Sequence, residues 1–262
     1  MIQGTCKLCL KERELLKSHF MPKALYATRR QKSATVVRTV VLSGETSHLK
    51  DYLLCRDCET RFEQNGESEA LKWLAPKAKR FPLGERLKDA LPRETFPEMS
   101  RYAACEIGLD AAKFAYFALS VVWRGAVHGW DLPDGTRTTP LDLGPHQETI
   151  RRFLSGEGAF PHDIASVIVL VCSDPEARSL WIIPCQDEEA GCENYRFIAR
   201  GVLFRVLLGT SIPDFLREAS CVSPRQPIVY GDCARRIRQD FPDLLQAAVS
   251  RRAGPRIKRP HA

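Results

Sequence analysis

Runs of apolar residues divide the second half of the chain into well-separated strands and helices. Residues 164–172 are almost all apolar and rich in β-branched side chains, which predicts a buried strand. Shorter runs of the same kind at 180–184, 195–199 and 202–208 follow at a spacing typical of a β-meander. Because helical patterns flank these strands, the region predicts an α+β fold.

The longest apolar stretch is expected to form a central helix. It starts after Asp110, which can cap the helix N-terminus, and it runs to about His128. Apolar residues cover nearly every face of this helix, so we expect other elements to surround it. A second helix is expected at the end of 141–154, and a closing helix is expected over 234–250.

The first third of the chain contains shorter predicted elements. β-branched residues at 35–42, followed by Ser-Gly, predict a strand and a turn. A short helix is expected at 22–27, with proline in its first turn. Another helix is expected from Cys58 to Asn65, where an Asn-Gly pair ends it. Residues 66–98 contain four prolines and predict a connector of short helices.

Two matched cysteine pairs carry the strongest chemical signal in the sequence. Cys6 and Cys9 form one Cys-x2-Cys knuckle, and Cys55 and Cys58 form another after a 45-residue insert. Each knuckle can place two thiolates on one ion, so together they predict a tetrahedral Zn²⁺ site. Such a site is coordinatively closed, so we expect structural zinc. The order of knuckle, hairpin, knuckle and helix is typical of a treble clef, with Cys58 in the first helical turn.

These patterns predict a division of the chain into four segments. We expect a treble-clef zinc module at 1–65, a helical connector at 66–98, an α+β domain of unknown role at 99–250 and a disordered tail at 251–262. Residues 1–98 carry 19 basic and 13 acidic residues. The α+β domain at 99–250 carries 15 basic and 19 acidic residues, and the tail carries five basic residues and no acidic ones. The basic zinc module favours a polyanion such as nucleic acid, although a solvated surface explains the charge equally well.

Composition and hydropathy exclude other classes of protein. The hydrophobic content of 44% and the charged content of 27% are ordinary for a soluble globular protein. The longest nearly uninterrupted apolar run, 114–123, has ten residues, whereas a membrane helix needs roughly 20. The N-terminus lacks the apolar core of a secretory leader, and paired cysteines without a leader are typical of a reducing compartment. We therefore expect a cytoplasmic protein with no membrane partner; its oligomeric state has no signal in the sequence.

The N-terminal motifs resemble those of the HNH endonucleases, which carry a zinc-stabilised ββα-metal module. The shared elements are the first Cys-x2-Cys knuckle, His19 followed after two residues by Pro22, and Leu-Leu-Cys-x2-Cys ending at Cys58. The resemblance covers residues 6 to about 64. The chain is also similar to an uncharacterised set of bacterial proteins that share Ser-His-x-x-Pro-Lys, Leu-Leu-Cys-x2-Cys-Glu and a later Ser-x-x-Trp-Arg, here at 120–124.

The resemblance to HNH enzymes implies roles for two residues. In that family the histidine is the general base that activates water, and a divalent ion stabilises the charge of the phosphorane. His19 would therefore be the base. Glu59, directly after Cys58, would occupy the position of the final ligand of a catalytic Mg²⁺ or Mn²⁺ ion.

The chain departs from the HNH pattern at two positions. Ser18 stands where the family has an acidic metal ligand, and no asparagine precedes Leu53. Asp51, or Glu63 one helical turn after Glu59, could supply the missing carboxylate.

Each of these side chains also has a structural interpretation. His19 could orient the hairpin or bind zinc in place of a cysteine, and Glu59 could complement the positive end of a helix. Arg124 on the apolar helix could bind an acidic ligand or a phosphate, although a salt bridge inside the core is the more common role. Cys185 and Cys192 are a weak candidate for a second metal site, in a loop between two strands.

Two functions from different classes therefore stay open. The leading hypothesis is a zinc-stabilised, HNH-like protein that acts on nucleic acid as a metal-dependent nuclease, a hydrolase of phosphodiester bonds. The alternative is a non-catalytic zinc protein that binds nucleic acid or another protein. The Ser-His-x-x-Pro spacing favours the enzyme, whereas the serine before His19 favours the binding protein.

Overall fold

A large mixed sheet and a small antiparallel sheet organise the fold. The computed structural model describes residues 2–26, 35–37, 40–42, 49–75, 81–132, 135–174, 177, 180–233, 237 and 241. The small sheet contains β1 (Ile2–Thr5), β2 (Glu12–His19) and β5 (Lys50–Cys55) in that order. The large sheet contains β3 (Thr35–Val37), β4 (Val40–Leu42), β6 (Glu94–Thr95), β7 (Met99–Ala103), β8 (Ala165–Cys172), β9 (Leu180–Glu189), β10 (Cys192–Ala199), β11 (Val202–Leu208) and β12 (Pro227–Gly231).

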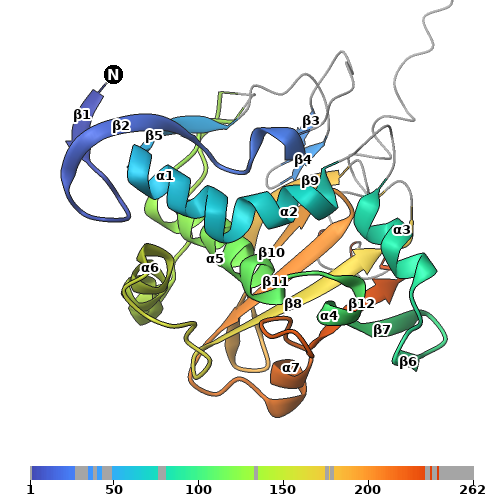
Figure 1. Cartoon of the computed structure of the whole chain (residues 1–262). Coiled ribbons are helices and arrows are strands. Elements are labelled where there is room, and N and C mark those ends of the chain that lie inside the picture. Colours follow the sequence, from blue (N-terminus) through green and yellow to red (C-terminus); the bar gives the residue numbers. More distant parts are fainter. Residues whose placement is uncertain are drawn as a thin grey trace, which may run out of the picture.

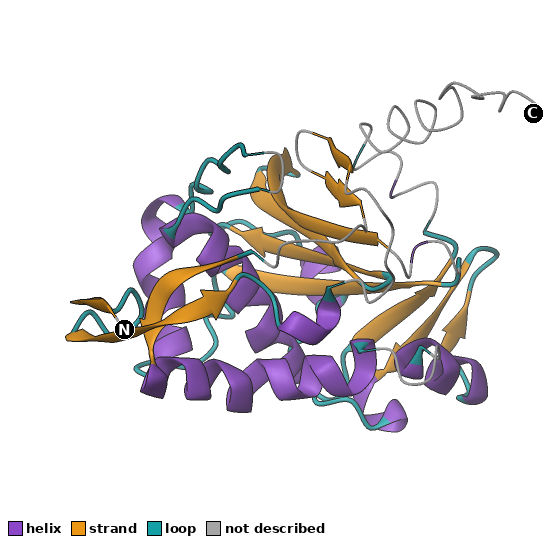
Figure 2. Ribbon diagram, turned by 90° about the horizontal axis from the view of Figure 1, so that it is seen from above, coloured by secondary structure: helices purple, strands orange, loops and turns teal. Residues whose placement is uncertain are grey.

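The helices gather mainly on one side of the large sheet (Figure 2). They are α1 (Arg56–Phe62), α2 (Ser68–Leu74), α3 (Pro82–Asp89), α4 (Ala104–Ile107), α5 (Ala111–Val127), α6 (Gln147–Ser155) and α7 (Asp214–Glu218), with the π-helical segment η2 (Glu63–Glu67) and the 3₁₀ turns η1 (Lys23–Leu25) and η3 (Gly144–His146). Two sheets with helices packed beside them confirm the predicted α+β class.

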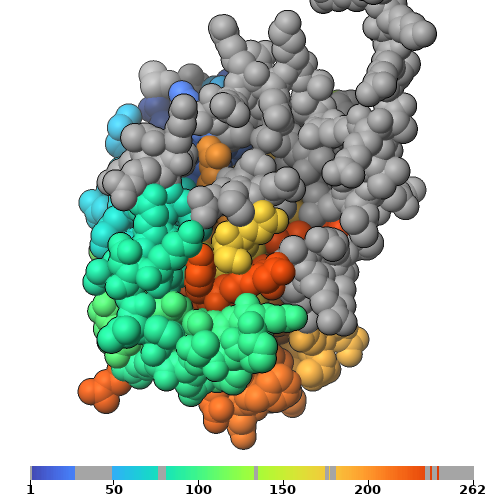
Figure 3. All heavy atoms as spheres, turned by 90° about the vertical axis from the view of Figure 1, so that its right-hand side faces the viewer, coloured from blue at the N-terminus to red at the C-terminus, as the bar shows by residue number. Residues whose placement is uncertain are grey.

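The large sheet has the order β3-β4-β9-β10-β11-β8-β12-β7-β6, and its pairs are antiparallel except for β8 with β12. The strands β9, β10 and β11 form the expected meander, whereas β8 pairs with β11 instead of with β9. The bounds of β11 match the sequence pattern. On the face shown in Figure 3, red residues of β12 lie between green residues around β7 and yellow residues of β8. No helix among the described residues is long and apolar enough to cross a membrane.

Helix α5 lies between the large sheet and a second layer of helix (Figure 1). The Asp110 side chain caps it by accepting a hydrogen bond from the backbone N–H of Lys113, at 3.1 Å. Towards the sheet, Phe114 and Phe117 contact the ring of Phe204, at centroid distances of 5.4 and 5.6 Å. Because partners cover it on both sides, the helix needs apolar residues all round, which confirms the predicted central position.

The opposite side of α5 contacts one long helix formed by α1, η2 and α2. The ring of Phe62 lies edge-on to the rings of Tyr116 and Trp123, both at 5.9 Å. The predicted helix end at Asn65-Gly66 is wrong, because the helix continues through η2 to Leu74. The physical reason is close packing: a Cβ on Gly66 would lie 2.8 Å from the Phe117 backbone nitrogen.

The insert between the two knuckles does not form the single strand predicted over 35–42. The triplets β3 and β4 pair antiparallel, with Val37 opposite Val40, and β4 also pairs with β9. The polar pair Arg38-Thr39 separates the two β-branched triplets in the sequence. Pairing with each other lets both triplets form ladder hydrogen bonds at the edge of the large sheet, which local sequence cannot reveal.

Several other predicted elements can be compared with the structure. Helix α6 begins at Gln147, and Gly156 at its C-cap has the left-handed conformation. The predicted helix at 22–27 is the 3₁₀ turn η1. Nearly all of the closing helix over 234–250, and the whole tail 251–262, lie outside the described residues. One apolar core contains residues from Cys6 to Ile228. The predicted division of the chain into segments at residues 65 and 98 stays a prediction.

The contact at Gly66 can be tested by Gly66→Ala. Alanine favours an isolated helix by about 1 kcal/mol, but here its methyl group would meet the backbone of α5. We expect the overlap to dominate and to lower the free energy of unfolding by about 1–3 kcal/mol, measured by urea denaturation. Gly158→Ala is the control, because a Cβ there meets nothing within 4 Å. Equal stability of the two variants would contradict the packing argument.

Candidate metal centre and adjoining pocket

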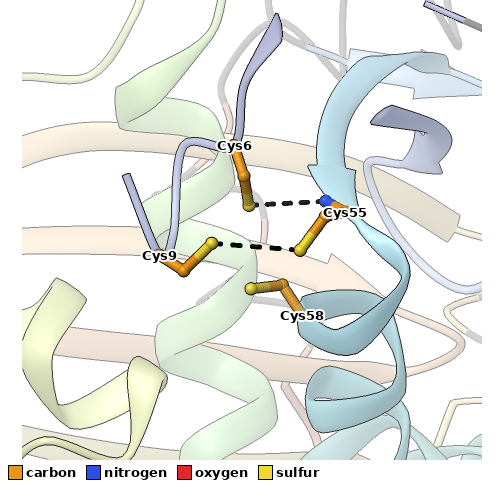
Figure 4. Close-up of side chains that lie close together, drawn as sticks. All are labelled: Cys6, Cys9, Cys55 and Cys58. Carbon is orange, nitrogen blue, oxygen red and sulfur yellow. Dashed lines mark hydrogen bonds between the residues drawn. The ribbon is translucent and has the colours of Figure 1, made fainter. Parts of the chain in front are cut away.

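The four predicted cysteine ligands meet at one point. Cys6 follows β1, Cys55 ends β5, and Cys58 lies in the first turn of α1. The side chains point toward one another (Figure 4), and their four sulfurs lie within 4.8 Å of one another. This cluster could hold a metal ion such as zinc. It is the only group of three or more possible ligands at this spacing within the part of the chain that the structure describes.

The spacing of the sulfurs fits a tetrahedral ion. Zinc–sulfur bonds of about 2.3 Å place tetrahedral sulfurs ~3.8 Å apart. The distance between the sulfurs of Cys9 and Cys55 is 3.9 Å. The backbone N–H of Cys55 also donates a hydrogen bond to the sulfur of Cys6, at 3.4 Å, as is common around bound thiolates. The cluster therefore needs little rearrangement to bind an ion.

The cysteine thiols perturb one another. A hydrogen bond from the Cys58 thiol lowers the pKa of Cys6 to about 4, and the same contact together with burial raises the pKa of Cys58. The lowered pKa favours the thiolate form of Cys6, which is the form of cysteine that binds metal.

The first knuckle is anchored to the rest of the protein by a buried arginine. Arg151 on α6 donates from Nη1 to the backbone oxygen of Leu8, at 2.7 Å, inside the Cys6–Cys9 loop. Its other donors reach Glu148 and Glu157. All three nitrogens of this guanidinium are therefore hydrogen-bonded, and the knuckle is held against α6 rather than projecting alone.

A pocket of about 480 Å³ lies beside the cysteine cluster and brings the two predicted catalytic residues to one cavity. His19, at the end of β2, and Glu59, in the first turn of α1, both line it. The remaining lining residues are Leu16, Pro22, Lys23, Ala24, Arg56, Thr60, Glu63, Glu67, Leu71 and Arg124. The pocket thus combines an imidazole, three carboxylates and three cationic side chains, although His19 and Glu59 are 40 residues apart in the sequence.

Glu59 is partly buried at this pocket. Burial raises its pKa above the usual value, although the charge of Arg124 and a hydrogen bond with Ser18 act in the opposite direction. Its Oε1 atom is buried without a hydrogen-bond partner among the described residues. A buried carboxylate oxygen without a partner costs stability, and a cost of this kind is typical of a functional position.

The positions that depart from the HNH pattern have other roles in the structure. Ser18 is buried, and its Oγ accepts a hydrogen bond from the backbone N–H of Leu54, at 3.1 Å. Asp51 points to His128, with Oδ2 2.9 Å from Nε2. Neither side chain lines the pocket, whereas Glu63 does. Of the two carboxylates suggested as replacements, only Glu63 is placed near His19 and Glu59.

Sequence patterns marked Arg124 and favoured a salt bridge for it, but they did not reveal its partner in the pocket, Glu67. Their ion pair, 2.6 Å from Arg124 Nη2 to Glu67 Oε1, joins α5 to η2 across 57 positions. The apolar neighbours of Arg124 were a signal, because a cation inside such a run needs a partner. Cys185 and Cys192 lie in the paired strands β9 and β10, with no further possible ligand near enough to complete a metal site in the described region.

Comparison of the chain with known protein families, with curated proteins and with solved structures found no match. The resemblance to HNH enzymes therefore rests on the sequence motifs alone.

We expect purified protein to contain one zinc ion per chain. Structural zinc contributes on the order of 10–16 kcal/mol in small zinc modules, so Cys58→Ser should lose the ion and unfold the region around the cysteines. Metal analysis and hydrogen exchange would measure both effects. Cys105→Ser is the control, because Cys105 is exposed and lies outside the cluster. Zinc-free protein with all four thiols reduced would contradict the assignment.

The burial of Glu59 predicts the sign of a stability change. Glu59→Gln removes a buried charge, so we expect the free energy of unfolding at pH 7 to rise by about 1 kcal/mol. Glu63→Gln, at an exposed position in the same pocket, should change it by less than about 0.5 kcal/mol. If Glu59 instead serves to stabilise the helix N-terminus, Glu59→Gln will lower stability, and chemical denaturation distinguishes the two outcomes.

Proposed function

We propose that this protein is a zinc-stabilised, HNH-like nuclease whose active site is the pocket at His19 and Glu59. The observation that carries the proposal is the presence of both side chains in one open cavity beside the cysteine cluster. The antiparallel pair β2 and β5 followed by α1 has the ββα order of HNH enzymes. The first knuckle precedes β2, and the second lies where β5 meets α1, which is the order expected of a treble clef. The cysteine cluster is then the structural zinc site.

In this proposal His19 accepts a proton from the attacking water, and Glu59 is the carboxylate that holds a divalent ion. A Mg²⁺ ion commonly uses only one or two protein carboxylates and completes its shell with water and phosphate oxygens. Glu59 and Glu63 are the available carboxylates nearest to the expected ligand position. Arg56 and Lys23 supply positive charge at the pocket rim for the substrate phosphates.

The surface of the small sheet supports a nucleic-acid substrate. Four basic side chains are exposed here: Lys7 and Lys11 between β1 and β2, and Arg13 and Lys17 on β2. Clustered exposed cations attract the nucleic-acid backbone by releasing its counterions, and the resulting affinity falls steeply with salt. This charge does not distinguish DNA from RNA.

The second candidate is a non-catalytic nucleic-acid-binding protein with the same zinc module. Two observations favour it: Ser18 is buried in place of an acidic ligand, and the pocket side chains do not bring three possible metal ligands within 4.8 Å of one another in the described structure. Binding would then use the basic surface of the small sheet, and His19 would have a structural role.

Cleavage by purified protein distinguishes the two candidates. We expect Mg²⁺- or Mn²⁺-dependent cleavage of single- or double-stranded DNA or RNA, and His19→Ala should reduce its rate by roughly 10²–10⁴-fold with zinc content unchanged. His146→Ala is the matched control, because His146 is similarly half-buried but lies outside the pocket. If the protein binds these nucleic acids in a salt-dependent way but cleaves none of them, the nuclease proposal is wrong and the binding-protein proposal stands.

A further inference from the structure

The floor of the pocket contains a buried arginine whose hydrogen-bonding capacity is not used by the described protein. Arg124 is 1% exposed, and its Nη2 donates to Glu67 Oε1 at 2.6 Å. Its Nε and Nη1 atoms are buried without an acceptor among the described residues. A guanidinium presents five N–H donors in a rigid fork, so the donors on these two nitrogens are left without an acceptor by the described protein.

The position of this arginine is well defined. The guanidinium carbon lies 4.5 Å from the centre of the Phe62 ring, and this cation–π contact stabilises the position of the guanidinium. Its backbone oxygen accepts a hydrogen bond from the indole of Trp130, at 3.1 Å. Glu67 belongs to the π-helical segment η2, and such segments often occur at functional sites. The fork is therefore held in place before any ligand arrives.

A second buried arginine, Arg151, provides a comparison because every nitrogen of its guanidinium has a hydrogen-bond partner. All three nitrogens of Arg151 are hydrogen-bonded, to Glu148, Glu157 and the backbone oxygen of Leu8. Arg151 therefore has a structural role that is complete without a ligand. Arg124 differs because it lines an open cavity and has unused donors.

The chemistry of the pocket identifies the class of ligand. The guanidinium fork fits oxygens of a phosphate or a carboxylate. The buried Oε1 of Glu59 has no hydrogen-bond partner among the described residues, so a divalent ion, a hydroxyl group or a water molecule on the ligand side would satisfy it. A phosphate group that brings a divalent ion, a hydroxyl group or bound water with it satisfies both side chains.

We propose that Arg124 binds a non-bridging oxygen of a phosphate group in this pocket, so that α5 completes a site whose other polar residues come from the small sheet, η1 and the long helix. Identification of that phosphate as part of a nucleic acid rests on the proposed function. Binding of phosphate by Arg124 does not, because a small phosphorylated ligand would use the same donors. Glu67 limits affinity by holding one of the three nitrogens.

The test compares Arg124→Lys, Glu67→Gln and the control Arg151→Lys. Inorganic phosphate and a fluorescent single-stranded 12-mer DNA are the probes, at low ionic strength, with zinc content and circular dichroism as measures of folding. We expect Arg124→Lys to weaken binding of both probes at least about tenfold, because lysine lacks the planar fork. Glu67→Gln should tighten binding, since it weakens the hydrogen bond to Nη2 and removes a competing charge. Arg151→Lys should leave both affinities unchanged.

Each outcome decides the inference. Unchanged affinity in folded, zinc-loaded Arg124→Lys overturns it, and so does weaker binding by Glu67→Gln. If Arg124→Lys does not fold, Glu67→Gln decides alone. Arg124-dependent binding of phosphate but not of DNA supports the phosphate site and removes the nucleic-acid assignment. If the protein cleaves DNA but its affinity for DNA does not depend on Arg124, the proposed nuclease function stands and the phosphate site is overturned.

Discussion

The close contact between α5 and the long helix of α1, η2 and α2 is the interaction on which the rest of the structure depends. Gly66 allows the helix backbones to approach, since its missing Cβ would overlap Phe117. Cys58 and Glu59 lie at the start of the long helix, and Glu67 lies near its middle. The same contact therefore fixes the cysteine cluster, the pocket wall and the carboxylate partner of Arg124 relative to the large sheet.

This arrangement separates two kinds of chemistry that lie side by side. A metal ion held by all four sulfurs of the cysteine cluster would have no position left for substrate. The pocket has the opposite character, since it is open and lined by side chains of both charges, some of which have unused hydrogen-bonding atoms. In the proposed function, neighbouring residues of one helical turn have different roles: Cys58 would stabilise the fold by binding metal, and Glu59 would bind the ligand.

The site is also shared between regions far apart in the sequence. His19 comes from the small sheet, Glu59 from the long helix and Arg124 from the central helix. Arg151 makes a second connection, from α6 to the first knuckle. Because helix α5 is packed on the large sheet, a ligand bound by Arg124 would contact an element of the α+β core as well as the N-terminal residues.

Local sequence by itself determined the Cys-x2-Cys pairs, the meander strands and the apolar helix capped by Asp110, because spacing, β-branching and capping act over a few residues. It also marked His19 and Glu59, which lie at one pocket, but it misplaced the helix end at Gly66 and the strand at 35–42. Only tertiary structure decided those features, since a glycine that ends a helix and one that admits a neighbouring helix look alike in sequence. The pairing of Arg124 with Glu67 was likewise decided by packing, because two charges 57 positions apart have no local signal until a fold brings them together.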